Sequence, residues 1–121
     1  MPFPKNHLIL ENDEFFAIPE KNAVNPGHTV IVLKKEVDYF FDLDDQTLGK
    51  MMIFSKKVAG ALKAAFPCRK IGVMVGGLVV RRAHLHLVPL LESVSELSFA
   101  RAKVTPDESL AKTAQSIRER L

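Results

Sequence analysis

The chain has 121 residues, of which 47% are hydrophobic and 26% charged, a composition typical of one globular domain and not of a disordered segment. Its net charge of +3 comes from Lys and Arg scattered among acidic residues, which does not indicate a nucleic-acid partner and allows at most a weak attraction for small anions. The single cysteine, Cys68, excludes an internal disulfide and is typical of a reducing compartment.

The first seven residues do not combine a basic start with an apolar run, as a secretory signal would. No apolar stretch in the sequence reaches the length of a membrane span. We therefore expect a cytoplasmic protein with no membrane partner.

The N-terminal third predicts three strands. Two short apolar runs, 8–11 and 15–18, are separated by a polar turn and predict a hairpin. A loop rich in turn-forming residues covers 20–27, and β-branched residues in 29–33 then predict a third strand.

A long amphipathic helix is predicted after a helical turn or ordered loop at 37–43. Apolar residues recur every three or four positions between 44 and 66, with lysines on the other face. Asp42 or Asp44 can cap its first amides, and Pro67 ends it.

Two more strands, a loop and a second helix complete the prediction. The strands cover 70–75 and 79–89, and 90–103 shows no clear period and is predicted as a loop. The terminal helix is predicted to start at Thr105 as cap, with Pro106 in its first turn and Glu108 in a capping box. The expected fold is α+β, a single domain over 1–121 whose sheet is five-stranded and mostly antiparallel.

Two histidines on alternate positions of the last predicted strand are the main functional signal. Period-two geometry places Arg82, His84 and His86 on one face, with the two imidazoles roughly 7 Å apart along the chain. Such a pair suits two groups acting on one substrate, and it equally suits a half-exposed polar face. A third histidine, His28, directly follows the turn 25–27 at the entrance of a strand.

Two separate blocks make the sequence similar to the histidine triad (HIT) family of nucleotide hydrolases and transferases. Residues 25–35 resemble the family's Pro-Gly-His turn and the strand after it. Residues 83–89 resemble the end of its His-φ-His-φ-His-φ-φ signature, in which φ is apolar. With the hairpin and the intervening helix, the resemblance covers about 8–90 and implies a HIT-like fold. The helix predicted from the sequence pattern at about 105–121 is a C-terminal extension to it.

The resemblance implies a role for each histidine. His84 corresponds to the nucleophile, which attacks the α-phosphorus of a nucleotide to give a nucleotidyl-histidine intermediate. His86 corresponds to the histidine that helps to protonate the leaving group, and His28 to the supporting histidine. Neutral imidazole has a free nitrogen lone pair at pH 7, as nucleophilic attack requires.

Nucleotide contacts and the oligomeric state are also implied by the family. Glu20 lies where the family commonly has an Asp that contacts the ribose hydroxyls, and Gly77 and Leu78 lie at its nucleotide-binding segment. The implied function is hydrolysis of a purine nucleoside 5′-phosphoramidate or a related conjugate of an AMP-like or GMP-like nucleotide. No cofactor is expected. A homodimer is expected, because family members commonly form two-fold dimers.

The chain departs from the family pattern in two places. Arg82 occupies the position of the first triad histidine, where its charge would lower the pKa of a neighbouring imidazole or bind a phosphate oxygen. Residues 77–80 are Gly-Leu-Val-Val where family members often have Gly-Gln-Ser-Val, which leaves fewer polar groups for a phosphate.

Two alternatives remain open at this point. The chain could be a nucleotide-binding module of the same fold with little or no catalysis, because Arg82 replaces a triad histidine. His28, His84 and His86 could instead bind zinc, although no carboxylate or thiol is placed by the sequence to complete that site.

Overall fold

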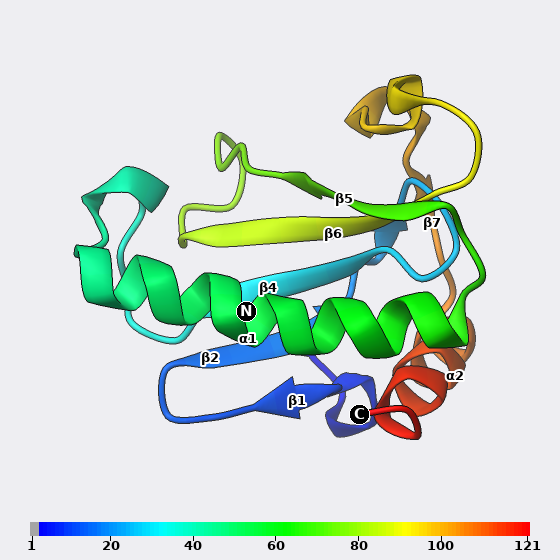
Figure 1. The fold of residues 1–121 in the computed structure, drawn as a ribbon, viewed down its shortest axis with the longest axis horizontal. Helices are drawn as coiled ribbons and strands as arrows, with labels where there is room; N and C mark the ends of the chain where they lie inside the picture. The colour runs from blue at the N-terminus through cyan, green and yellow to red at the C-terminus, as the bar shows by residue number, and fades with distance from the viewer. Residues whose placement is uncertain (1–2) are drawn as a thin grey trace.

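A five-stranded antiparallel sheet with one long helix across it forms the body of the protein in a computed structural model that describes residues 3–121 (Figure 1). The strand order is β1-β2-β4-β6-β5, and a separate two-stranded ribbon pairs β3 with β7. The strands are β1 (Leu10–Glu11), β2 (Phe15–Pro19), β3 (Asn22–Ala23), β4 (Thr29–Leu33), β5 (Lys70–Met74), β6 (His84–Leu90) and β7 (Lys103–Val104). The helices are α1 (Asp45–Ala65) and α2 (Asp107–Arg118), with 3-10 turns at η1 (Lys5–His7), η2 (Phe40–Asp42), η3 (Val94–Glu96) and η4 (Phe99–Arg101).

The main core lies between α1 and one face of the sheet. Leu85 and Leu87 of β6 point into it and are almost completely buried, as are Met51 and Val58 on the inner face of α1. The Asp44 carboxylate accepts a hydrogen bond from the backbone amide of Thr47 at 2.7 Å and caps the helix. The predicted helix, with Asp44 as one of its two candidate caps, is confirmed.

The other face of the sheet carries the histidines. In the register of β4 and β6, Val30 lies opposite His86 and Val32 opposite His84, so these four residues share one face. His28 precedes β4 by one residue and falls on the same face by period two. The sheet therefore separates a packed apolar face from the face that holds the imidazoles.

Three predictions about local structure are wrong. The strand expected from 79 begins only at His84, because the backbone amide of Ala83 donates to the carbonyl oxygen of Val37 (2.6 Å) instead of continuing the β5 ladder. The predicted loop at 90–103 contains η3, η4 and β7. The predicted cap Thr105 does not cap α2, whose N-cap is Pro106 and which has no side-chain cap from Thr105 or Glu108.

The single domain predicted over 1–121 includes Met1 and Pro2, which lie outside the described residues. Within residues 3–121, no helix combines the length and the apolar character needed to cross a bilayer.

Candidate active site

The three histidines lie together, and a hydrogen bond joins two of them. His28 Nε2 lies 2.9 Å from His86 Nδ1, and the His84 and His86 rings have centroids 5.0 Å apart. All three side chains are buried, with His28 at 1% exposure and His84 the most accessible at 8%. The structure thus brings together the three histidines that the sequence singled out.

Hydrogen-bond partners fix which ring nitrogens carry protons. The backbone amide of Val24 donates to His28 Nδ1 at 2.9 Å, so neutral His28 carries its proton on Nε2 and donates it to His86 Nδ1. His86 in turn carries its own proton on Nε2. His84 Nδ1 lies 2.7 Å from the carbonyl oxygen of Arg82, which can only accept, so the lone pair of neutral His84 is on Nε2.

Burial keeps two of these histidines neutral. Desolvation lowers the pKa of His28 to about 4. Desolvation also lowers the pKa of His86, to about 3, with repulsion from positive charge on His28 or His84 as a further cause. At pH 7 the pair is therefore two uncharged imidazoles that share one directed hydrogen bond.

The turn before His28 depends on a glycine. Gly27 has φ +90°, and a Cβ there would lie 2.8 Å from Cγ of Phe66 at the end of α1. Only glycine combines the positive φ with this close approach, so the Pro-Gly-His turn packs directly against the end of the helix.

A cavity of about 620 Å³ opens over His84 and His86. Its walls also include the predicted nucleotide contacts Glu20, Gly77 and Leu78. The remaining lining residues are Asn22, Val30, Gly76, Val79, Val80, Phe99, Ala102 and Val104. Among the described residues that line it there is no Lys or Arg, and Glu20 is the one acidic side chain.

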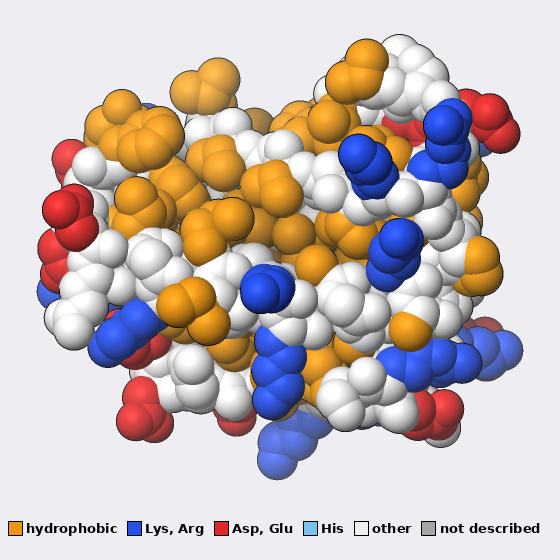
Figure 2. Space-filling view, in the orientation of Figure 1, with side chains coloured by type: hydrophobic (Ala, Val, Ile, Leu, Met, Phe, Trp, Pro, Cys, Tyr) orange, Lys and Arg blue, Asp and Glu red, His pale blue; other side chains and the backbone are white. Residues whose placement is uncertain are grey.

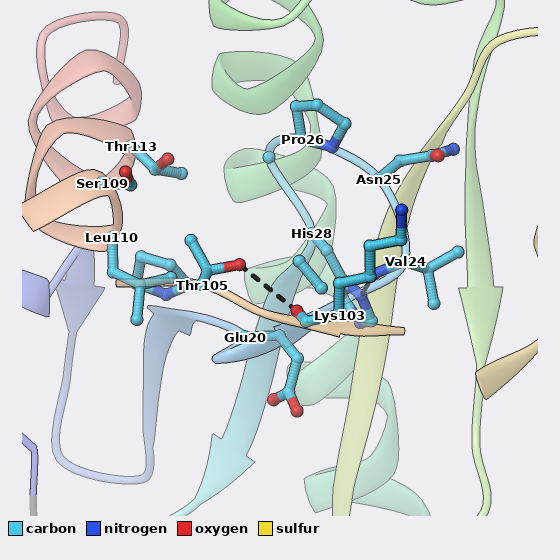
Figure 3. Close-up of a pocket in the computed structure, with 13 residues that line it drawn as sticks. Glu20, Val24, Asn25, Pro26, His28, Lys103, Thr105, Ser109, Leu110 and Thr113 are labelled. Carbon is cyan, nitrogen blue, oxygen red and sulfur yellow. Dashed lines mark hydrogen bonds between the residues drawn. The ribbon is translucent and has the colours of Figure 1, made fainter. Parts of the chain in front are cut away.

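Glu20 lies between two cavities. It also lines a smaller cavity of about 360 Å³, which Figure 3 shows between the turn before His28 and the side chains of Ser109 and Thr113 on α2. Burial raises the pKa of Glu20, while the backbone amide of Asn22 and the charge of a protonated His84 oppose that rise. The β3–β7 ribbon runs between the cavities, with Val104 on the larger and Lys103 on the smaller.

Arg82 is not among the residues that line the cavity. Its guanidinium pairs with Glu36 at 3.2 Å. Only the backbone carbonyl of Arg82 reaches the site, where it accepts a hydrogen bond from His84 Nδ1. Because β6 starts at His84, the strand alternation that would have placed Arg82 beside the imidazoles does not apply.

Two side chains that the sequence did not single out complete the surroundings. Phe99 packs edge-on against His86 with centroids 4.7 Å apart, and no pattern in the predicted loop identifies it. Glu96 is 3% exposed, and its carboxylate accepts a hydrogen bond from Asn25, in the turn before His28. Its position after Ser93 matches the Ser-x-x-Glu capping-box pattern, which could have revealed it.

No group of three or more His, Cys, Asp or Glu side chains within residues 3–121 is arranged to hold a metal ion. His28 and His86 bond to each other, which occupies the lone pair of His86 Nδ1, while the amide of Val24 occupies that of His28 Nδ1. The geometry gives the zinc alternative no support.

A model of the HIT domain matches residues 4–93, three quarters of the chain. The chain belongs to the HIT domain family. This fold is used by nucleotide-binding hydrolases and transferases, and the Arg82 and Leu78 differences occur inside the matched region.

Individual relatives support the assignment. The HIT domain is 25% identical over 88 residues to an uncharacterised HIT-like protein of Saccharolobus solfataricus, covering 69% of this chain and 63% of that protein. Among solved structures, a HIT-like protein of Bartonella henselae involved in cell-cycle regulation has TM-score 0.81 and 29% identity, covering 94% of this chain and 86% of that one. A hypothetical histidine triad nucleotide-binding protein of Sulfolobus tokodaii has TM-score 0.80 and 26% identity, covering 93% and 81%.

Proposed function

We propose that the protein hydrolyses a purine nucleoside 5′-phosphoramidate, or a related nucleotidyl conjugate, through a covalent nucleotidyl-His84 intermediate. The observation that carries the proposal is the orientation of His84: the Arg82 carbonyl holds the proton on Nδ1 and leaves the lone pair on Nε2. His84 is also the most accessible of the three imidazoles and lines the 620 Å³ cavity.

The reaction proceeds in two displacements at phosphorus. His84 Nε2 forms a bond to the α-phosphorus while the bond from phosphorus to the leaving amine breaks, and the amine leaves with a proton taken up from solvent. Water then attacks the nucleotidyl-histidine, loses a proton and restores His84. The sum is one water consumed, with a nucleoside monophosphate and a free amine released.

His86 and His28 have supporting roles in this proposal. At pH 7 His86 is neutral, so it donates a hydrogen bond from Nε2 to the substrate and does not transfer a full proton. His28 fixes the ring of His86 through the Nε2 to Nδ1 hydrogen bond. Glu20 accepts hydrogen bonds from the ribose hydroxyls, and the backbone of Gly77 and Leu78 lies beside the nucleotide.

A trapping experiment tests the proposal. The protein is incubated with an adenosine 5′-phosphoramidate and the guanosine equivalent, quenched, and measured by intact mass for a nucleotidyl adduct alongside product release. The expected result is an adduct in the wild type and none in His84→Asn. Folded wild-type protein that gives neither adduct nor turnover would refute the proposal.

One observation favours a second candidate function, a nucleotide-binding module with little catalysis. The guanidinium of Arg82 pairs with Glu36, His86 is neutral at pH 7, and the described residues that line the cavity include no Lys or Arg. Calorimetry that finds nucleotide binding without hydrolysis would favour this module. Arg82→His separates the two readings of Arg82: a large gain in rate means that the natural residue impairs catalysis, and a loss means that it assists.

We also propose a homodimer formed through the open edge of the sheet. β5 is the edge strand beyond β6, and Val73 on its α1 side is 46% exposed, while Val75 just after the strand is 43% exposed. Figure 2 shows apolar side chains gathered over the upper part of this face, and Lys and Arg side chains stand within the face to the right of them and below. Exposed edge strands and large apolar patches are typical of association surfaces. Light scattering after size exclusion should give twice the chain mass for the wild type and a lower mass for Val73→Lys.

A further inference from the structure

A buried carboxylate outside the histidine cluster organises the segment between β6 and β7. Glu96 Oε2 accepts hydrogen bonds from the backbone amides of Glu92 (2.7 Å) and Ser93 (2.6 Å), and Oε1 accepts from that of Leu91 (2.9 Å). Oε1 also accepts a bond from Asn25 Nδ2 at 2.7 Å. These backbone donors lower the pKa of Glu96 to about 2, so its side chain is an anion at neutral pH.

Asn25 carries this anchor to the histidines. Its side-chain amide donates one hydrogen bond to Glu96 and another, of 2.8 Å, to the carbonyl oxygen of Pro89 on β6. The backbone carbonyl oxygen of Asn25 accepts a hydrogen bond from the backbone amide of His28 at 3.1 Å. One buried side chain thus joins the turn that holds His28 to the strand that holds His86.

The same segment also contacts His86 directly. Phe99 lies three residues after Glu96 and packs edge-on against the His86 ring, which is itself bonded to His28. The position of each imidazole in the pair is therefore tied to the loop that Glu96 holds together, although Glu96 contacts neither ring.

We infer that Glu96 and Asn25 form a clasp that positions the His28–His86 pair and so keeps the hydrogen bond between them directed from His28 Nε2 to His86 Nδ1. Glu96 is a positioning residue that acts through Asn25. Its effect on imidazole geometry does not depend on whether the site is catalytic, whereas its effect on turnover rests on the proposed hydrolase function.

Two substitutions break the clasp in different ways. Glu96→Gln replaces one carboxylate oxygen with an amide NH₂, which faces N–H donors whichever way the side chain turns. Asn25→Ala leaves Glu96 bonded to its three backbone amides and keeps the backbone bond from His28 to residue 25, so only the side-chain bonds to Glu96 and Pro89 are lost. Glu92→Gln is the matched control, because this substitution makes the same change of charge in the same loop at a residue that is exposed.

Long-range ¹H–¹⁵N spectra of the histidine rings at pH 7 provide the readout. In the wild type and Glu92→Gln we expect His28 and His86 each as a single tautomer protonated on Nε2, with a slowly exchanging His28 ring proton. In Asn25→Ala, and in Glu96→Gln if it folds, we expect averaged tautomer shifts and faster exchange of that proton. Unchanged His28 and His86 signals in folded Asn25→Ala would overturn the inference, as would equal changes in Glu92→Gln.

Turnover of the nucleoside phosphoramidate separates this inference from the proposed function. If the wild type turns over, the clasp variants should lose roughly tenfold or more in kcat with little change in KM, because a displaced imidazole pair no longer fits the transition state. If the wild type does not turn over, the proposed function fails, and the ring spectra still decide the inference by themselves.

Discussion

The two halves of the stretch 75–90 differ sharply although they are adjacent in the chain and lie in one cavity wall. β6, from His84 to Leu90, is buried on both faces and hydrogen-bonded to strands on both sides. Residues 75–82 before it are not in any strand, and Leu78 and Val79 are more than nine-tenths exposed. The imidazoles are therefore held by the core of the protein, while the exposed apolar side chains of Leu78 and Val79 are not held by packing.

The largest expected effect is an acid destabilisation caused by His86 in the buried half and by its hydrogen-bonded partner His28. The folded-state pKa values of His28 and His86 lie below their unfolded value of about 6.5, so the unfolded chain binds more protons as pH falls. The stability due to these two groups is full above pH 6.5 and is lost as the pH falls, down to about 4 for His28 and about 3 for His86. Between pH 7 and pH 5 each histidine should remove on the order of 2 kcal/mol from the free energy of unfolding.

Urea denaturation at pH 7 and pH 5 measures this loss. His28→Asn should be less sensitive to pH than the wild type over the same interval, whatever its stability at pH 7. An equal pH dependence in the two proteins would mean that His28 does not titrate as its burial implies.

Leu85→Ala tests how far β6 depends on the core beneath it. Leu85 is fully buried between His84 and His86 in sequence, on the opposite face, and its truncation should cost about 3 kcal/mol through lost burial and the cavity left behind. Chemical denaturation at pH 7 measures the loss. A cost below 1 kcal/mol would show that the strand is held mainly by its hydrogen bonds.

Gly27→Ala tests the close packing of the His28 turn on α1. The new Cβ combines an unfavourable positive φ with a contact of 2.8 Å to the Phe66 ring, so we expect a loss of about 2 kcal/mol. Gly60→Ala is the control, because an added Cβ there meets nothing within 4 Å and Gly60 lies in a helix interior. Alanine at position 60 should stabilise by up to about 1 kcal/mol.

The smallest effect is expected in the exposed half. Leu78→Ser removes a side chain that is 94% exposed, so the free energy of unfolding should change by less than about 0.5 kcal/mol. Affinity for a nucleotide, measured by calorimetry, should change while stability does not, because Leu78 lines the cavity. A destabilisation comparable to that of Leu85→Ala would erase the distinction between the two halves.

Regular patterns predicted much of this fold and the histidine cluster. The α1 stripe, the β-branched run of β4 and the His-x-His alternation of β6 are local signals with a fixed period, and each was sufficient to identify its element. The Pro-Gly-His turn added His28 to the same site through the family resemblance.

Features that depend on contacts between distant residues could not be predicted in this way. β3 and β7 have two residues each and form only because Asn22 pairs with Val104 and Ala23 with Lys103. Arg82 lies outside β6 because the amide of Ala83 donates to the carbonyl oxygen of Val37 in the loop after β4. The guanidinium of Arg82 pairs with Glu36 in the same loop. Phe99 has no periodic signal at all, and only the packing of the 91–101 segment brings it to His86.

The cavity over the histidines is built from two parts of the chain, which the β3–β7 ribbon joins. The match to the family ends at residue 93, yet the cavity takes Phe99, Ala102 and Val104 from beyond that point. A chain cut at residue 93 would retain all three histidines and lose one wall of the pocket. The shape of the cavity and the placement of the imidazoles are therefore coupled through this C-terminal wall, because Phe99 belongs to the wall and also packs against His86.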